Sequence, residues 1–201
     1  YVPYLRGNEK VYSFELLNLV LSIGGHVDSA FKEMARYPEF SSNDDCKQIL
    51  DLLKKSDENV KKGKAPKTVP IWLSLRAFEN EYQLSQKKVI FKRLPEREQI
   101  MPFKPFSSKT HAPEWWEIYN GLKHDVGFNI EKANLQNTRD ALAAAFLLNV
   151  IHIPGTLRLR EYGVLNIGEP PGDWMLEKWI KNEERFLGFV ATPIFVYNYD
   201  Q

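Results

Sequence analysis

Residues 134–152 read NLQNTRDALAAAFLLNVIH, and the second half of this stretch is almost entirely apolar. Asn134 can cap a helix here, because its side-chain oxygen accepts hydrogen bonds from the free N–H groups of a first turn. The pair Pro154-Gly155 predicts that the helix ends near His152. The small side chains of residues 143–145 let a neighbouring helix approach closely. The stretch therefore predicts a strongly apolar helix of a closely packed bundle.

Apolar side chains recur at helical spacing in four further segments, which are residues 11–36, 44–54, 71–84 and 114–125. Asn8 is a candidate cap for the first of them. Gly24-Gly25 lies inside that first segment, where two glycines weaken or bend a helix unless another backbone packs closely against them. Residues 54–67 are predicted to be a basic linker, since they combine lysines with Gly63 and Pro66.

Strand-like patterns are confined to short stretches, at residues 89–91, 164–167 and 194–197, with a short helix expected at 174–183. The sequence thus predicts a mainly α protein. Residues 1–154 are expected to form a helical bundle domain with a basic, loop-rich middle segment. Residues 155–201 are expected to form a small β-containing C-terminal extension packed on the same domain.

The composition excludes several classes of protein. With 201 residues, 43% of them hydrophobic, the chain can bury a substantial core, which excludes intrinsic disorder and a disulfide scaffold. Cys46 is the single cysteine and follows two aspartates, which raise a thiol pKa, so we expect it to be unreactive. One free cysteine suits a reducing, cytoplasmic compartment. No apolar run is long enough to span a bilayer, so we expect no membrane partner.

The net charge of +1 hides a segregation of charge along the chain. Residues 54–109 carry 14 Lys and Arg against 6 Asp and Glu, a net +8, and the remainder carries 13 against 20, a net −7. A basic segment of this kind is either solvated surface or a contact for an anionic partner such as RNA. Lys104 and Lys109 within it are candidate RNA contacts.

Residues 114–125, EWWEIYNGLKHD, bring several polar side chains to one end of a predicted helix. Asn120 and His124 share a face, and Tyr119 and Lys123 form the adjacent row. His124 can accept and return a proton near neutral pH, and Lys123 can hold a phosphate. Asn120 can orient a hydroxyl or phosphoryl oxygen, and the phenol of Tyr119 can donate a hydrogen bond. These four residues are the candidate catalytic residues.

The series Tyr119-Asn120-x-x-x-His124 resembles the signature of the HEPN superfamily, which is an arginine, a polar residue, three variable residues and a histidine at a helix start. The long first helix, the Ala-rich last helix and the tryptophan pair before the motif are similar too, so the resemblance covers residues 11–152. It implies an all-α bundle that dimerises. In active members it implies a metal-independent RNase of defence or toxin systems, which cuts RNA through the 2′-hydroxyl in a cleft shared by two subunits.

This chain departs from that pattern at Tyr119, where the family has the arginine that anchors the scissile phosphate. The leading hypothesis is a HEPN-like domain that engages RNA. In its catalytic form this domain would be an endoribonuclease that uses His124 for proton transfer and needs no metal or cofactor. Trp116 and Asp125 are further candidate RNA contacts. The alternative is a non-catalytic, dimeric interaction or scaffold domain in which the motif serves packing.

Simpler roles are open for the histidines. His124 with Asp125 can serve as a C-terminal cation and a cap of the helix, a role that spacing alone favours. A third hypothesis, a metal-dependent hydrolase, would use His111 and His124, although no two histidines have a recognised metal-ligand spacing. His152, near the end of an apolar helix, is typical of a capped or core-edge histidine.

Overall fold

The computed structural model describes residues 7–91, 98–104, 112–125, 127, 130–163, 165–167, 189–192 and 194–198. The α-helices in this part of the chain are α1 (Phe14–Met34), α2 (Asp44–Lys61), α3 (Ile71–Tyr82), α4 (Glu114–His124), α6 (Leu135–Ile151) and α7 (Ile153–Glu161). Short 3-10 helices are η1 (Pro38–Phe40), η2 (Leu84–Gln86) and η4 (Ile130–Lys132). The mainly α class is confirmed, whereas the helix expected at 174–183 lies outside the described residues.

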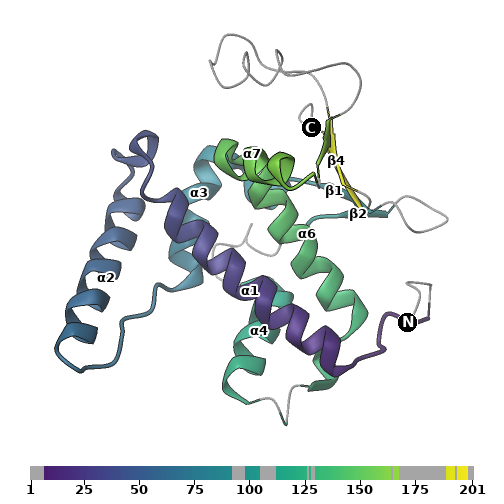
Figure 1. The fold of residues 1–201 in the computed structure, drawn as a ribbon, viewed down its shortest axis with the longest axis horizontal. Helices are drawn as coiled ribbons and strands as arrows, with labels where there is room; N and C mark the ends of the chain where they lie inside the picture. The colour runs from purple at the N-terminus through teal and green to yellow at the C-terminus, as the bar shows by residue number, and fades with distance from the viewer. Residues whose placement is uncertain are drawn as a thin grey trace.

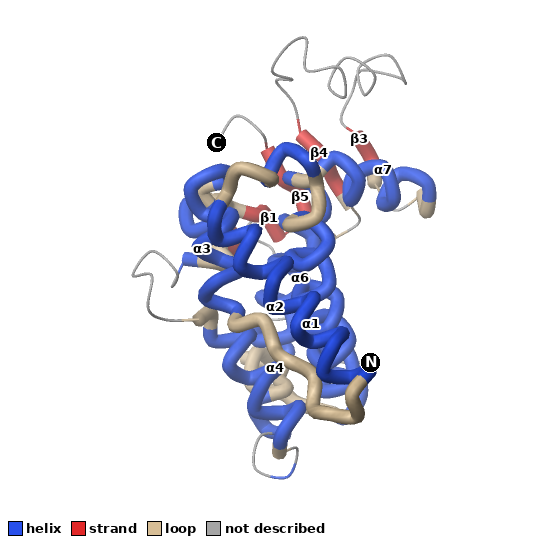
Figure 2. Tube along the Cα trace, turned by 90° about the vertical axis from the view of Figure 1, so that its left-hand side faces the viewer, coloured by secondary structure: helices blue, strands red, loops and turns tan. Residues whose placement is uncertain are grey.

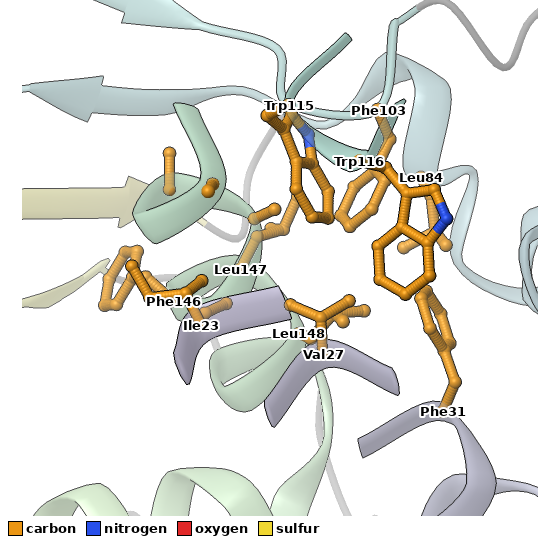
Figure 3. Packing of buried hydrophobic residues seen from close by; sticks show 14 of the residues in the cluster. Ile23, Val27, Phe31, Leu84, Phe103, Trp115, Trp116, Phe146, Leu147 and Leu148 are labelled. Atoms are coloured by element: carbon orange, nitrogen blue, oxygen red, sulfur yellow. The ribbon is translucent and has the colours of Figure 1, made fainter. Parts of the chain in front are cut away.

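Helix α6 lies at the centre of the bundle. It packs along α1, and α4 contacts both helices (Figure 1). Every residue from 143 to 148 is buried, so the helix is enclosed on all sides, as its apolar sequence predicted. Figure 3 shows Ile23 and Val27 of α1 beside Phe146 and Leu148 of α6. The predicted cap is also confirmed, because Asn134 Oδ1 accepts a hydrogen bond of 3.0 Å from the backbone N–H of Asn137.

Helix α1 starts at Phe14, so the predicted cap at Asn8 was wrong. Ser13 caps the helix instead, and its hydroxyl oxygen accepts a hydrogen bond of 3.2 Å from the backbone N–H of Leu16. Gly24 is buried in the middle of α1, and a Cβ atom built on it would overlap the ring of Tyr119 from α4. Gly24 therefore allows close packing, although the neighbour is an aromatic ring and not a backbone.

Helix α2 continues to Lys61, so the basic linker predicted from residue 54 is half helical. Lysine and glutamate have high helix propensity, so this part of the chain continues the helix. The first glycine after them is Gly63, just beyond the end of α2. The connection that follows runs back along α2, since Asn59 Nδ2 donates to the Ala65 carbonyl at 3.2 Å and the Lys67 N–H donates to Ser56 Oγ at 3.1 Å. Figure 1 shows α2 at the left edge of the molecule, where it packs against α3.

A five-stranded antiparallel sheet joins the middle of the chain to its C-terminal part. Its order is β2-β1-β5-β4-β3, with bounds Glu98–Ile100, Val89–Phe91, Phe195–Asn198, Phe189–Ala191 and Asn166–Ile167. Ile90 of β1 pairs with Val196 of β5, and the Phe195 ring stacks on Phe146 of α6 at 5.6 Å between ring centroids. The sheet thus lies against α6, near α7 (Figure 2). The predicted strands at 89–91, 164–167 and 194–197 correspond to β1, β3 and β5.

Helix α7 was not predicted. The chain turns sharply after α6, and the axes of the two helices differ in direction by 108°. Pro154 stands in the first turn of α7, where its missing N–H costs no hydrogen bond, so the proline that ends one helix also starts the next. Gly155 makes the turn compact, because a Cβ atom on it would lie 2.6 Å from the carbonyl oxygen of Asn149.

The two adjacent glycines of α1 provide a test of the packing between α1 and α4. We expect Gly24→Ala to lower the free energy of unfolding by about 1–3 kcal/mol, because the new methyl group overlaps the buried Tyr119 ring. Gly25 has no atom within 4 Å of an added Cβ, so Gly25→Ala should stabilise the helix by up to about 1 kcal/mol. Urea denaturation of both variants measures the difference, and equal effects would contradict the packing described here.

Candidate functional site

The motif helix α4 is held in place by its aromatic side chains. Trp115 Nε1 donates a hydrogen bond of 2.9 Å to the carbonyl oxygen of Pro102. The Trp116 ring meets Trp115 edge-on at 5.7 Å and packs against Tyr119 at 4.9 Å between centroids. Trp116 is only 4% exposed, so it has no open face on which an RNA base could stack. These contacts fix the orientation of α4 and of the polar residues at its end.

Tyr119, the first of the four candidate catalytic residues, belongs to the core. It is buried between Trp116 and Gly24. Burial raises the pKa of its phenol, with a smaller contribution from the nearby negative charge of Asp28. Asp28 is itself ion-paired with Lys32 one turn further along α1. Tyr119 thus contributes packing and no cationic group.

The other motif residues lie progressively closer to solvent. Asn120 is half-buried, whereas Lys123, His124 and Asp125 are exposed at the C-terminal end of α4. The Lys123 ammonium lies 5.9 Å from the centroid of the Tyr119 ring, within range of a cation–π contact. The Asp125 N–H donates to the Gly121 carbonyl at 2.8 Å and closes the helix. His124 is therefore presented to solvent from a helix whose other face is locked in the core.

The candidate RNA contacts outside α4 are only partly described. Lys104 is exposed at the end of the segment that follows β2. Lys109 lies outside the described residues, as does His111, the first histidine of the metal-dependent hypothesis. The structure therefore places Tyr119, Asn120, Lys123 and His124 on one helix, α4.

A second group of exposed cations lies on residues 54–67, the C-terminal half of α2 and the connection behind it, which we call the lysine arm. The arm carries 6 lysines against Asp57 and Glu58. All of its lysines are exposed, and no described carboxylate lies within ion-pair distance of any of them: Lys54, Lys55, Lys61, Lys62, Lys64 and Lys67. Their charges are therefore available to an anionic partner.

A cavity of about 200 Å³, which was not predicted from the sequence, lies between α1, α6 and the start of α7. Two histidines and one ion pair line it: His26 from α1, His152 from the joint of α6 and α7, and Glu33 with Arg158. His152 is 6% exposed, and burial lowers the pKa of its imidazole. Arg158 reaches the cavity from α7, a helix that was not predicted, so no local sequence pattern indicated this site.

The described residues offer no alternative centre for metal or thiol chemistry. They contain no group of three His, Cys, Asp or Glu side chains that could hold a metal ion. Burial, with a smaller contribution from Asp45, raises the pKa of the Cys46 thiol to about 11, as expected for an unreactive cysteine. No single described helix is long and apolar enough to cross a membrane, and the pair α6–α7 meets those requirements only when its two bent parts are combined.

Comparison with known proteins identifies no relative: no protein-family model, curated protein or solved structure matches this chain.

The lowered pKa of His152 predicts a pH dependence of stability. The His152 imidazole binds a proton less readily in the folded chain than in the unfolded chain. The free energy of unfolding should therefore fall as the pH drops from about 6.5 towards the lower pKa of the folded state. Glu33 opposes this effect and Arg158 reinforces it, while the ring of Tyr37 packs edge-on against the imidazole at 4.6 Å.

Urea unfolding from about pH 7.5 to about pH 5.5 tests this expectation. Wild type should lose more stability over this range than His152→Gln, which carries no titrating ring at the position. The same loss in both proteins would show that the imidazole does not contribute.

Proposed function

We propose that this chain is a helical domain that engages RNA, with the lysine arm as the main contact for the phosphate backbone. The exposed, unpaired lysines of the arm carry the proposal, because charge neutralisation of phosphates supplies most of the sequence-independent affinity for nucleic acid. Lysine suits this role as a mobile point charge that needs no fixed geometry. The resemblance of residues 119–124 to the HEPN signature favours RNA over other polyanions.

The spacing along the arm fits an extended strand. Lys54 and Lys61 are seven residues apart, about two helical turns, so they share a face of α2 and lie roughly 10 Å apart along its axis. Lys55 on the neighbouring face has the same sequence spacing to Lys62, the C-cap residue of α2. Two rows of charge can thus follow several successive phosphates of one strand.

Replacement of Lys55 and Lys62 by Gln should weaken binding to a short single-stranded RNA and reduce its salt dependence. If both lysines contact phosphates, the slope of log Kobs against log salt should fall by about 1.4 in magnitude, about 0.7 for each. Fluorescence anisotropy at several salt concentrations measures both quantities.

Lys47→Gln is the matched control, since Lys47 lies on the same helix but is already ion-paired with Asp44 at 2.7 Å. Equal affinity and slope for the double variant and this control would contradict the role of the arm. An acidic peptide that competes as well as RNA would show a general anion surface and reject RNA as its specific partner.

A second candidate function is cleavage of the bound RNA, favoured by the exposure of His124 at the C-terminal end of α4. In this HEPN-like scheme, His124 takes the proton of a 2′-hydroxyl as the 2′-oxygen attacks the adjacent phosphorus. The bond from phosphorus to the 5′-oxygen breaks, and the leaving oxygen takes a proton from the second His124 of a dimer. The products are a 2′,3′-cyclic phosphate and a 5′-hydroxyl. Lys123 supports the negative phosphate, since Tyr119 carries no charge.

Cleavage of a labelled RNA in EDTA tests this candidate. His124→Ala should lower the rate by at least about 100-fold, the usual contribution of a general acid or base. Glu81→Gln, at an exposed position on α3, should retain the wild-type rate. If the wild-type protein binds RNA without cutting it, the binding function stands and the catalytic function is rejected. Sedimentation of the same samples determines whether the domain dimerises.

A further inference from the structure

The cavity between α1, α6 and α7 lies where one helix ends and the next begins. Its volume of about 200 Å³ is below the usual range of sites for drug-sized ligands, so it suits a small group. Pro154 and Gly155, in the first turn of α7, form part of its wall. No side chain caps this helix, and the first N–H groups of any helix have no partners within it. The positive end of the α7 dipole therefore adjoins the cavity.

His152 provides a second, independent sign of a ligand. It is 94% buried at the N-cap position of α7, and its Nε2 is the one buried side-chain nitrogen or oxygen among the described residues without a hydrogen-bond partner. A buried polar atom without a partner is rare, because it loses its hydration and gains nothing in exchange. The imidazole lines the cavity, so a small group that enters next to the ring can supply the partner that the protein does not.

The hydrogen bonds of His26 define what it offers to the cavity. Asn149 Nδ2 lies 2.9 Å from His26 Nε2 and also donates to the Ala145 carbonyl at 2.7 Å. In the tautomer in which Nε2 accepts from this amide, the ring proton lies on Nδ1. His26 is thereby left with an N–H donor and no free acceptor.

The one carboxylate of the cavity is already neutralised. Glu33 accepts hydrogen bonds from both terminal nitrogens of Arg158, with 3.2 Å between Nη1 and Oε2. A guanidinium has five N–H groups, so Arg158 retains donors after it has bound Glu33. Ser29 adds a hydroxyl to the same wall. Arg158, Ser29 and His26 therefore present donors to a small, partly apolar space, and His152 adds one when its ring proton is on Nε2.

We propose that this cavity binds a compact oxyanion, a phosphate or a carboxylate group, between the start of α7, Arg158 and the two histidines. An oxyanion offers several acceptors and no obligatory donor, which complements these donors. A metal cation is a poor alternative, because the described residues form no cluster of three potential ligands. The site is separate from the lysine arm and from α4, so it stands or falls independently of RNA binding.

The test is a titration of the full chain with inorganic phosphate and, in parallel, with acetate, at ionic strength kept constant with chloride. NMR resonances of the imidazole C–H groups of His26 and His152 report occupancy directly. We expect saturable shifts of both rings in wild type, and an increase in the melting temperature as the site fills. Saturation by phosphate alone identifies a phosphate or phosphate ester as the ligand class, and saturation by acetate as well extends the class to carboxylates.

Arg158→Gln should weaken the binding about tenfold, the usual loss for one charge-assisted contact. Arg76→Gln is the control, since Arg76 is also an exposed arginine paired with a carboxylate, that of Asp45, but lies on α3. If Arg158→Gln fails to fold, His26→Ala is tested in its place, because His26 is exposed. This variant should weaken phosphate binding as well. Shifts that do not saturate in wild type, or equal dissociation constants for the variant and the control, would overturn the proposal.

Discussion

The enclosure of α6 on all sides is the constraint on which the rest of the structure depends. A helix whose residues 143–148 are all buried needs a neighbour on every face. Helix α1 covers one face, α4 a second, the Phe195 ring of β5 a third, and α7 closes the C-terminal end. Close approach requires small residues at the crossings, and Gly155 against the backbone of Asn149 provides one of them.

Such a core has little room for polar side chains at its centre. The candidate functional side chains therefore lie at the ends of the helices. Lys123 and His124 lie at the C-terminal end of α4, where their side chains leave the packed part of the helix. His152 lies between the end of α6 and the start of α7, and the lysine arm begins where α2 has passed its last buried residue, Ile49. Each candidate surface therefore sits where the packing constraint is released.

The sequence was informative wherever the determining signal was local. The Asn134 cap and the apolar run behind it gave α6 correctly, because capping and periodicity involve residues only a few positions apart. Helix α2 was predicted too short because exposed lysines fit a linker and a solvated helix equally well. The burial of Tyr119 depends on Gly24, far away in the sequence, and the cavity depends on three helices. Neither is visible in a local pattern.

The packing of Tyr119 against Gly24 also limits which side chain can stand at position 119. A guanidinium at position 119 would have to lie under Trp116 and against α1, where an unpaired charge is strongly disfavoured. Asp28 is the nearby carboxylate that could pair with it, but Lys32 already occupies Asp28. The uncharged phenol is thus the group that this packing tolerates, with a pKa raised further by burial. A phosphate bound at the end of α4 must accordingly be held by Lys123 or by lysines outside the helix, because position 119 is committed to the core.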